Sequence, residues 1–311
     1  MQKVIGVGET ILDILFKNQQ PISAVPGGSC FNSIISLGRT GMPCTFVGYS
    51  GNDRPGRQTE QMLRDNGIDT RWFQLREEEK SAVALAYLND AGDADYLFYK
   101  PQPSLDDNWQ WPQPEADDVL LLGSYFAICP TTHPQIQRLL QAASRQGATV
   151  YYDLNFRRSH QHELQELMPA ILQNYRLSTI VRGSADDFEI MYGTRDTAYI
   201  YDQYIRPHCP LFLCTAGEGT VSVHTPRGQI SLQAPRIPDV VSTVGAGDNF
   251  NAGLVYAIMK RGLKREDLHT MEPEQWRPLL QTAIAFAGEA CRSHHNYVSR
   301  QFTASLNQKQ P

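Results

Sequence analysis

The chain has 311 residues, of which 41% are hydrophobic and 20% charged, a composition that excludes disordered and fibrous proteins. Its 28 Lys and Arg against 33 Asp and Glu give a net charge of −5, which argues against a nucleic-acid binder. No apolar stretch approaches the ~20 residues needed to cross a membrane, and Glu9 and Asp13 interrupt any signal-peptide core. Six cysteines without a CxxC pair predict reduced, buried thiols in a cytoplasmic protein.

Five short runs of apolar or β-branched residues predict strands that are buried on both faces. They are Val4–Val7, Val119–Leu122, Thr149–Tyr152, Thr179–Val181 and Leu211–Cys214. Apolar spacing predicts a helix over 132–147 that ends at Gly147, and another over 162–175, in which Pro169 could begin a second helix. This alternation of strands and helices predicts right-handed βαβ units and a parallel sheet.

Small and polar residues follow each of these strands, as in Gly8-Glu9 and Asp153-Leu154-Asn155. The carboxyl ends of parallel strands share the edge where open α/β sheets bind ligands, so we expect a crevice there, although turns alone favour the same residues. Residues 81–100 predict two strands around a turn at 89–92, which must pack on another element and can cover the crevice as a flap. Residues 100–114 predict a loop and 303–311 a frayed tail.

The strongest local signal is the segment Gly245-Ala246-Gly247-Asp248, which leads into an amphipathic helix. A small-residue turn at a helix start presents backbone N–H groups to an anion, and the helix dipole adds positive potential. An aspartate at its rim is placed to take a proton from a nucleophilic hydroxyl. Turn chemistry alone also permits an aspartate that only stabilises the helix N-terminus.

This segment, VSTVGAGDNFNAG, closely resembles the C-terminal signature D-T-x-G-A-G-D-x-F of the PfkB, or ribokinase-like, carbohydrate kinases. Upstream, PGGSCFNSIISLGRTG (26–41) resembles the Gly-Gly signature of that family, and VGYSGNDRPG (47–56) resembles the V-G-x-x-G-x-D-x-x-G that follows. The resemblance covers nearly the whole chain. It implies a single α/β domain over 1–311, with a doubly wound, mainly parallel sheet flanked by helices. It also implies a small β-sheet lid formed by parts of 12–33 and 81–108.

The family resemblance further implies that ATP, with Mg²⁺, phosphorylates a sugar hydroxyl. By position, Asp248 is similar to the catalytic base, and Gly245, Ala246 and Gly247 resemble the anion hole. The positions expected to bind substrate are Asp13, Gly28, Asn32, Tyr99 and Arg157. Those expected at the nucleotide are Ser184, Thr215, Gly217 and Gly219, with Asp187 toward the metal. Arg157 lies in DLNFR, where it can reach phosphate or form a structural ion pair with Asp153.

Four segments of the chain depart from the family pattern. Thr220 replaces the last glycine of the nucleotide loop. SADD (184–187) replaces N-x-x-E with oxygen ligands of shorter reach, and a water could bridge the gap to Mg²⁺. Ser242 replaces an aspartate that helps to bind a monovalent cation, which argues against potassium activation. Ser29 replaces a lysine of ribokinases and some sugar-phosphate kinases, which disfavours a phosphorylated substrate.

The predicted function is that of an ATP-dependent sugar kinase, specifically a fructokinase, because GETILD (8–13) and FYKPQPS (98–104) are similar to fructokinase segments. Kinases of ribose, 2-keto-3-deoxygluconate or a nucleoside remain alternatives, as does a sugar-binding protein with degraded catalysis. The expected partners are a sugar and ATP, without nucleic acid or membrane. We also expect a homodimer joined through the hairpin, although the sequence does not decide which of its residues face the partner: Val83, Leu85, Tyr87 and Leu97.

Overall fold

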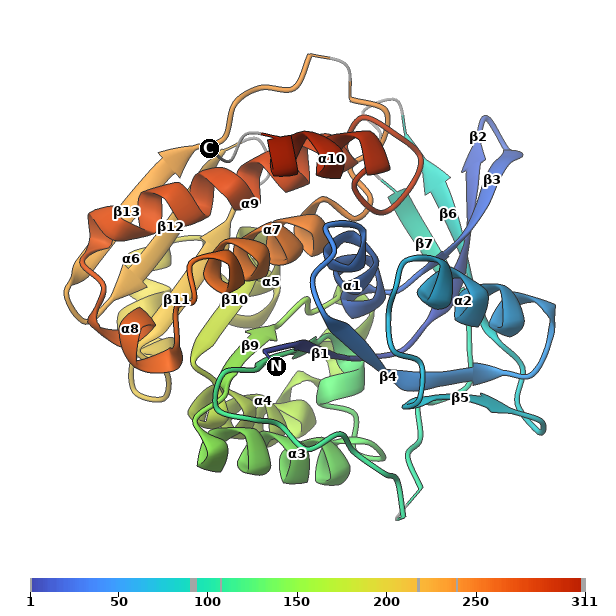
Figure 1. The fold of residues 1–311 in the computed structure, drawn as a ribbon, viewed down its shortest axis with the longest axis horizontal. Coiled ribbons are helices and arrows are strands. Elements are labelled where there is room, and N and C mark those ends of the chain that lie inside the picture. Colours follow the sequence, from blue (N-terminus) through green and yellow to red (C-terminus); the bar gives the residue numbers. More distant parts are fainter. Residues whose placement is uncertain (1, 90–93, 107, 217–218, 239, 309–311) are drawn as a thin grey trace. The chain divides into compact units, whose positions relative to one another are not determined.

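A computed structural model describes residues 2–89, 94–106, 108–216, 219–238 and 240–308 (Figure 1). The chain forms two compact units. Unit 1 comprises Met1–Gln2, Pro103–Arg236 and Ala257–Gln281, and unit 2 comprises Lys3–Gln102, Ile237–Tyr256 and Thr282–Pro311. Among the described residues, no helix has the length and apolar character needed to cross a membrane.

Unit 1 contains a run of parallel strands, each paired with the next: β8 (Val119–Gly123), β9 (Thr149–Asp153), β10 (Ile180–Ser184) and β11 (Leu211–Thr215). The antiparallel strands β12 (Thr220–Thr225) and β13 (Gly228–Gln233) follow β11 in the sheet order. The helices are α3 (His133–Gln146), α4 (Leu164–Leu177), α5 (Ala185–Tyr192), α6 (Thr197–Ile200) and α8 (Arg265–Thr270). Short turns of helix lie at Tyr125–Ala127, Arg158–Glu163, Tyr201–Ile205 and Pro273–Trp276.

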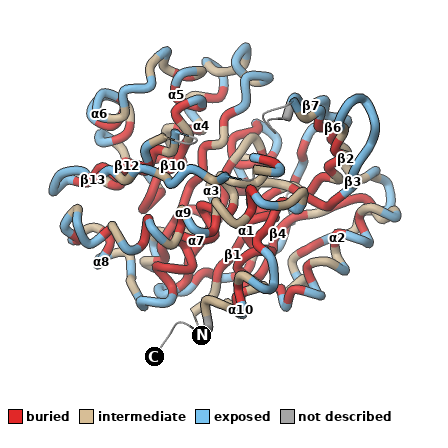
Figure 2. The backbone as a smooth tube through the Cα atoms, turned by 90° about the horizontal axis from the view of Figure 1, so that it is seen from above, coloured by how far each residue is buried: buried red, intermediate tan, exposed pale blue. Residues whose placement is uncertain are grey.

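Unit 2 has parallel strands in the order β1 (Val4–Val7), β4 (Cys44–Gly51) and β5 (Phe73–Arg76). Helices α1 (Ser29–Arg39) and α2 (Arg54–Asp65) pack against these strands, and Figure 2 shows the buried backbone of β1 and β4. Helix α7 (Ala246–Lys260) begins in this unit, α9 (Arg277–Ala290) ends in it, and α10 (Arg300–Gln308) follows. A separate small sheet has the order β3 (Gln20–Gly27), β2 (Ile11–Lys17), β6 (Ala82–Leu88) and β7 (Ala94–Tyr99).

The predicted strands and the α/β class with mainly parallel strands are confirmed, and Gly147 ends α3 in the left-handed conformation, with φ 79°. The hairpin is also confirmed, although residues 90–93 of its turn lie outside the described part. The two hairpin strands and the strands β2 and β3 form the small sheet expected of a lid. That this sheet acts as a lid stays a prediction. The single domain over 1–311 also stays a prediction.

Two local predictions are wrong. Pro169 does not begin a second helix, because α4 runs through it and buries Leu167, Ile171 and Tyr175 on one continuous face. The frayed tail predicted over 303–311 is wrong for 303–308, which belong to α10, while residues 309–311 lie outside the described part. Thr303 there is 3% exposed, and the neighbouring Phe302 packs edge-on against Phe286 with ring centroids 5.2 Å apart. Tertiary packing thus orders a segment whose composition suggests a tail.

The register of the small sheet decides which side chains share a face. Asp13 pairs with Ala84 and Leu15 with Ala86, while Phe98 pairs with Ala84. Because side chains of paired residues lie on one side and alternate along each strand, these residues lie on one face, named here the Asp13 face. The opposite face carries Val83, Leu85, Tyr87, Leu97 and Tyr99.

Two helical glycines of unit 2 give a matched test of packing against helix propensity. A Cβ on Gly253 of α7 would lie 2.7 Å from the Cα of Ala283, whereas one on Gly288 of α9 would meet nothing nearer than Ile237 at 3.5 Å. Alanine is favoured over glycine in helices by roughly 0.5–1 kcal/mol. We therefore expect Gly288→Ala to raise the free energy of unfolding by up to that amount and Gly253→Ala to lower it, as measured by urea denaturation. Equal stabilisation of both variants would contradict the close approach of α7 and α9.

Candidate active site

The turn before α7 has the geometry of an anion cradle. Gly245 has φ 79°, and a Cβ there would lie 2.8 Å from the carbonyl oxygen of Asn296, so only glycine fits. Helix α7 begins at Ala246, which places Gly247 and Asp248 in its first turn. Backbone N–H groups of a first turn have no acceptor within the helix, and the helix dipole favours negative charge beside them. The turn can therefore hold a phosphoryl group.

A buried asparagine fixes this turn. The Asn249 side chain is fully buried, and its Nδ2 donates to the carbonyl oxygens of Gly245 at 2.7 Å and of Asn296 at 2.9 Å. Its Oδ1 accepts a hydrogen bond from the Ser36 hydroxyl at 2.5 Å. Because a buried amide is costly unless paired, these bonds hold the turn, α1 and the segment at 296 in one arrangement.

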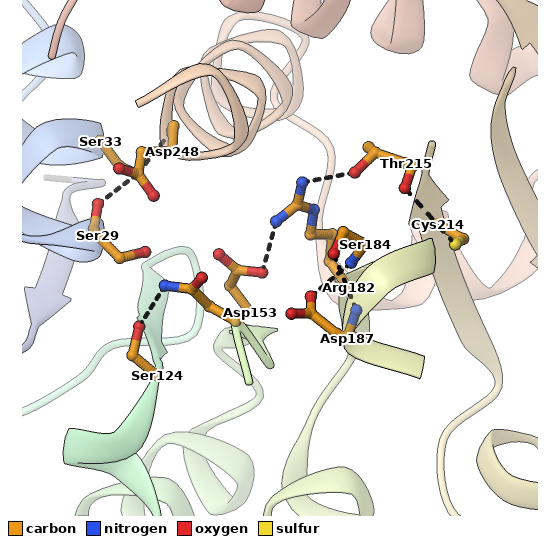
Figure 3. A network of polar contacts seen from close by, with 11 residues as sticks. Ser29, Ser33, Ser124, Asp153, Arg182, Ser184, Asp187, Cys214, Thr215 and Asp248 are labelled. Carbon is orange, nitrogen blue, oxygen red and sulfur yellow. Dashed lines mark hydrogen bonds and ion pairs between the residues drawn. The ribbon is translucent and has the colours of Figure 1, made fainter. Parts of the chain in front are cut away.

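Asp248 lies beside Asn32 of α1. Asn32 Nδ2 donates to Asp248 Oδ2 at 2.8 Å. The Ser33 hydroxyl donates to the Asp248 carbonyl oxygen at 2.7 Å (Figure 3). Asn32 is 4% exposed, and its Oδ1 has no hydrogen-bond partner among the described residues. The buried Asn32 oxygen can therefore accept a hydrogen bond from a hydroxyl group, and the neighbouring carboxylate of Asp248 can accept the proton of a hydroxyl.

Asp13 joins the same group of residues. The amide of Asn296 donates to Asp13 Oδ2 at 2.8 Å, and both side chains are buried. A Cβ on Gly27 would lie 2.2 Å from Asp13 Oδ2, and one on Gly28, with φ 128°, would lie 2.5 Å from the carbonyl oxygen of Glu9. The two glycines therefore let the chain before α1 pass directly against Asp13. Unit 2 thus brings together Asp13, Gly28, Asn32, Gly245, Ala246, Gly247 and Asp248.

Tyr99 does not join them. Its side chain is 63% exposed and lies on the face of the small sheet opposite Asp13, because Tyr99 pairs with Val83. Phe98 occupies the Asp13 face instead. The expected contact between Tyr99 and the sugar held by Asp13 therefore has no support from the register of this chain.

Unit 1 gathers the expected nucleotide residues along the carboxyl ends of its strands. The Arg182 guanidinium donates to Asp153 Oδ1 at 2.9 Å and to the Thr215 hydroxyl at 2.7 Å (Figure 3). Asp153 therefore pairs with Arg182. The predicted alternative, an ion pair between Asp153 and Arg157, is not formed, and Arg157 is exposed. Gly219 donates its N–H to the Ala216 carbonyl oxygen at 2.8 Å, and Gly217 lies outside the described residues.

Ser184 and Asp187 form a capping box at the start of α5. The Ser184 N–H donates to Asp187 Oδ2 at 2.7 Å, and the Asp187 N–H donates to the Ser184 hydroxyl at 3.1 Å. One carboxylate oxygen of the expected metal residue is thus engaged by its own helix. Desolvation raises the pKa of Asp187, outweighing the hydrogen bond from Ser184 and the positive charge of Arg182.

The sequence did not predict a role for Asn296, Asn249 or Arg182. Asn296 belongs to no sequence motif, and Asn249 and Arg182 resemble ordinary helix and strand residues in the sequence.

Ser242 is buried, and its hydroxyl accepts a hydrogen bond from the Val244 N–H at 3.2 Å. Among the described residues, no group of three or more His, Cys, Asp and Glu side chains could hold a metal ion.

The family model described as "pfkB family carbohydrate kinase" matches residues 1–295. Aminoimidazole riboside kinase of Salmonella typhimurium is 29% identical over 84% of this chain and 82% of its own, and fructokinase of Klebsiella pneumoniae is 26% identical over 93% and 94%. Fructokinase from Vibrio cholerae O395, solved with fructose, ADP and potassium ion, aligns with a TM-score of 0.85 at 21% identity over 98% of both chains. This last likeness concerns the fold alone.

The raised pKa of Asp187 predicts how stability depends on pH. Between the unfolded pKa, near 3.8, and the higher folded pKa, the native state binds more protons than the unfolded state, so the wild type loses stability as pH rises through this window. Relative to Asp187→Asn, which does not titrate and keeps an acceptor for Ser184, the wild type should therefore become less stable as the pH rises from the unfolded pKa through the folded pKa. Thermal denaturation of both proteins across this range measures the difference. A difference that stays constant with pH would show that the carboxyl is not desolvated.

Proposed function

The chain belongs to the pfkB family of carbohydrate kinases, and from this premise we propose that it is an ATP-dependent fructokinase. The observation that carries the chemistry is Asp248, placed in the first turn of α7 directly after Gly245–Gly247 and 2.8 Å from the buried amide of Asn32. A phosphoryl transfer needs positioning and electrostatic stabilisation more than covalent chemistry, and these residues supply both.

In the proposed reaction, Asp13 and Asn32 hold hydroxyls of the sugar, and Asp248 accepts the proton of the reacting hydroxyl. The hydroxyl oxygen forms a bond to the γ-phosphorus, the bond from that phosphorus to the bridging oxygen breaks, and ADP leaves. The N–H groups behind Gly245 stabilise the negative charge on the transferred group. Mg²⁺, when bound with ATP, neutralises charge on the phosphate oxygens.

For the nucleotide we propose Ser184, Thr215, Gly217 and Gly219, with Arg157 toward the phosphates. Thr215 is held by Arg182 at 2.7 Å, which fixes the side chain at the start of the loop. Asp187 would act on Mg²⁺ through water, because one of its oxygens already accepts from Ser184. Potassium activation is not proposed, since Ser242 supplies no charge and its hydroxyl is engaged at Val244. We place the enzyme in the cytoplasm.

Fructose is supported by relatives named fructokinase and by the fructokinase-like segments at 8–13 and 98–104. A second candidate substrate is a riboside, favoured by the 29% identity to an aminoimidazole riboside kinase. A panel of D-fructose, D-ribose, 2-keto-3-deoxygluconate, adenosine and aminoimidazole riboside, assayed for ADP release, distinguishes them. Sugar binding without ADP release from any member would instead indicate a binding protein with degraded catalysis.

Replacing the proposed base gives a direct test of its role. Asp248→Asn keeps the size of the side chain and removes the proton acceptor, so kcat should fall by roughly 10²–10⁴-fold. The dissociation constant of the sugar, measured calorimetrically without ATP, should change little by comparison. Turnover close to that of the wild type in this variant would remove Asp248 from the mechanism.

We also propose a homodimer joined through the small sheet. Leu97 is 51% exposed and Tyr87 is 37% exposed, and both lie with Val83 and Leu85 on the face opposite Asp13. Burial of this face contributes about 25 cal/mol per Å² of apolar area before the costs of association. Light scattering at micromolar concentration should give twice the 35.0 kDa chain mass, and Leu97→Asp should give the single chain. A wild-type species of one chain mass would contradict the dimer.

A further inference from the structure

Two carboxylates hold the two ends of the hairpin β6–β7. At its start, Asp53 Oδ2 accepts the N–H of Ser81 at 2.9 Å, and Asp53 Oδ1 accepts the hydroxyl of the same residue. At its end, the ammonium of Lys100 lies 2.6 and 2.8 Å from the two carboxylate oxygens of Glu9. Each carboxylate therefore makes two contacts with one residue that flanks the hairpin.

Both carboxylates come from the carboxyl ends of adjacent strands. β1 and β4 pair in parallel, with Val7 opposite Val47, so Glu9 and Asp53 leave the same edge of the sheet in unit 2. Asp53 also accepts the Gly56 N–H at 3.1 Å and so caps α2. The hairpin is thus fastened to the most buried strands of the unit and not only to its strand neighbour β2.

The anchor at Ser81 depends on close backbone approach. A Cβ on Gly51 would lie 2.6 Å from the N of Ser81, and a Cβ on Gly56 would lie 1.9 Å from the carbonyl oxygen of Gly51. The Ser81 hydroxyl lies 2.9 Å from that of Ser50. These contacts give the motif V-G-x-x-G-x-D-x-x-G a structural role at the base of the hairpin.

The anchor at Lys100 lies on the side of the sheet that carries Asp13. Lys100 follows Tyr99, so its side chain points to the same side as Phe98, and its Nζ is 5.7 Å from the centre of the Phe98 ring. The side chains of Lys100 and Glu9 are 17% and 25% exposed, so the pair is only partly screened by water. The carbonyl oxygen of Glu9 in turn packs against Gly28 at the start of α1.

We propose that Glu9 with Lys100 and Asp53 with Ser81 are positioning residues that hold the hairpin over the sugar, an inference that rests on the proposed kinase function. β6 lies directly beside β2, which carries Asp13, so the position of the hairpin sets the walls around the sugar. Loss of either anchor lets the hairpin move away from the sugar while Asp248 and the Gly245 turn stay in place. The anchors therefore act on sugar binding more than on the chemical step.

The test separates KM from kcat in Lys100→Met, Ser81→Ala and the conservative Lys100→Arg. We expect Lys100→Met to raise the KM for the sugar at least fivefold over the wild type, with kcat within about threefold of the wild-type value. Ser81→Ala should raise KM by a smaller factor. Lys100→Arg should keep KM within twofold of the wild-type value. The exchanged variant E9K/K100E should recover most of the loss. Arg71→Met is the matched control, because it removes a similar cation from an exposed pair with Asp69 in the same unit.

Hydrogen exchange of the amides in 82–88 and 94–99 gives a readout that does not depend on activity. It should be at least fivefold faster in Lys100→Met than in the wild type and unchanged in Arg71→Met. Faster exchange with an unchanged KM would overturn the positioning role, and unchanged exchange would overturn the anchor itself. If the wild type phosphorylates no sugar, the proposed function fails, whereas the exchange data still decide whether the anchors exist.

Discussion

The candidate site of unit 2 depends on the fully buried amide of Asn249. Its three hydrogen bonds reach Gly245 in the turn before α7, the backbone of Asn296 in the segment after α9, and the hydroxyl of Ser36 in α1. The side-chain amide of Asn296 in turn donates a hydrogen bond to Asp13, which connects Asp13 to the same network. Because each partner would leave a buried polar group unpaired if it moved, the turn and the carboxylate of Asp13 hold one another in place.

In unit 1 a buried ion pair holds the residues of the candidate site in place, whereas in unit 2 buried amide side chains do so. Arg182 and Asp153 are both almost fully buried, and burial alone would lower the pKa of the guanidinium; the carboxylate of Asp153 outweighs this effect and raises it. A buried ion pair contributes little net stability but is costly to break, so it favours one arrangement of the groups around it. Here that arrangement presents the hydroxyl of Thr215 at the end of β11.

The departures from the family pattern have local physical consequences in this chain. In SADD the shorter acid closes a capping box with Ser184, so the residue that stands for the family's glutamate stabilises α5 in addition to any role at the metal. At Ser242 the hydroxyl bonds to the backbone two residues later and helps to shape the turn that ends at Gly245. At Ser242 the chain lacks the charge of the family's aspartate, and at Asp187 it lacks the length of the family's glutamate. In both places the side chain instead forms a hydrogen bond with the nearby backbone.

The five buried strands, the hairpin, helices α3, α4 and α7 and the motif positions could be predicted from the sequence alone, because they follow from local patterns. Short apolar runs such as Val119–Leu122 favour buried strands. Gly-Ala-Gly-Asp before an apolar helix face favours an anion cradle, although turn chemistry alone also permits an aspartate that only stabilises the helix N-terminus. The pairing of Asn32 with Asp248, 216 positions apart, was expected only as membership of one site through the family resemblance.

Tertiary structure alone decided the partners that have no local signature. Asn296, Asn249 and Arg182 act through residues distant in the sequence. Asn249 lies within the C-terminal signature, next to Asp248, but no local pattern identifies its partners Ser36 and Asn296. The face occupied by Tyr99 was also undecided, because a shift of one residue in strand register exchanges the two faces of a sheet. The order of 303–308 depends likewise on Phe286 and the buried surface around it, since packing and not propensity supplies the free energy that orders a short terminal helix.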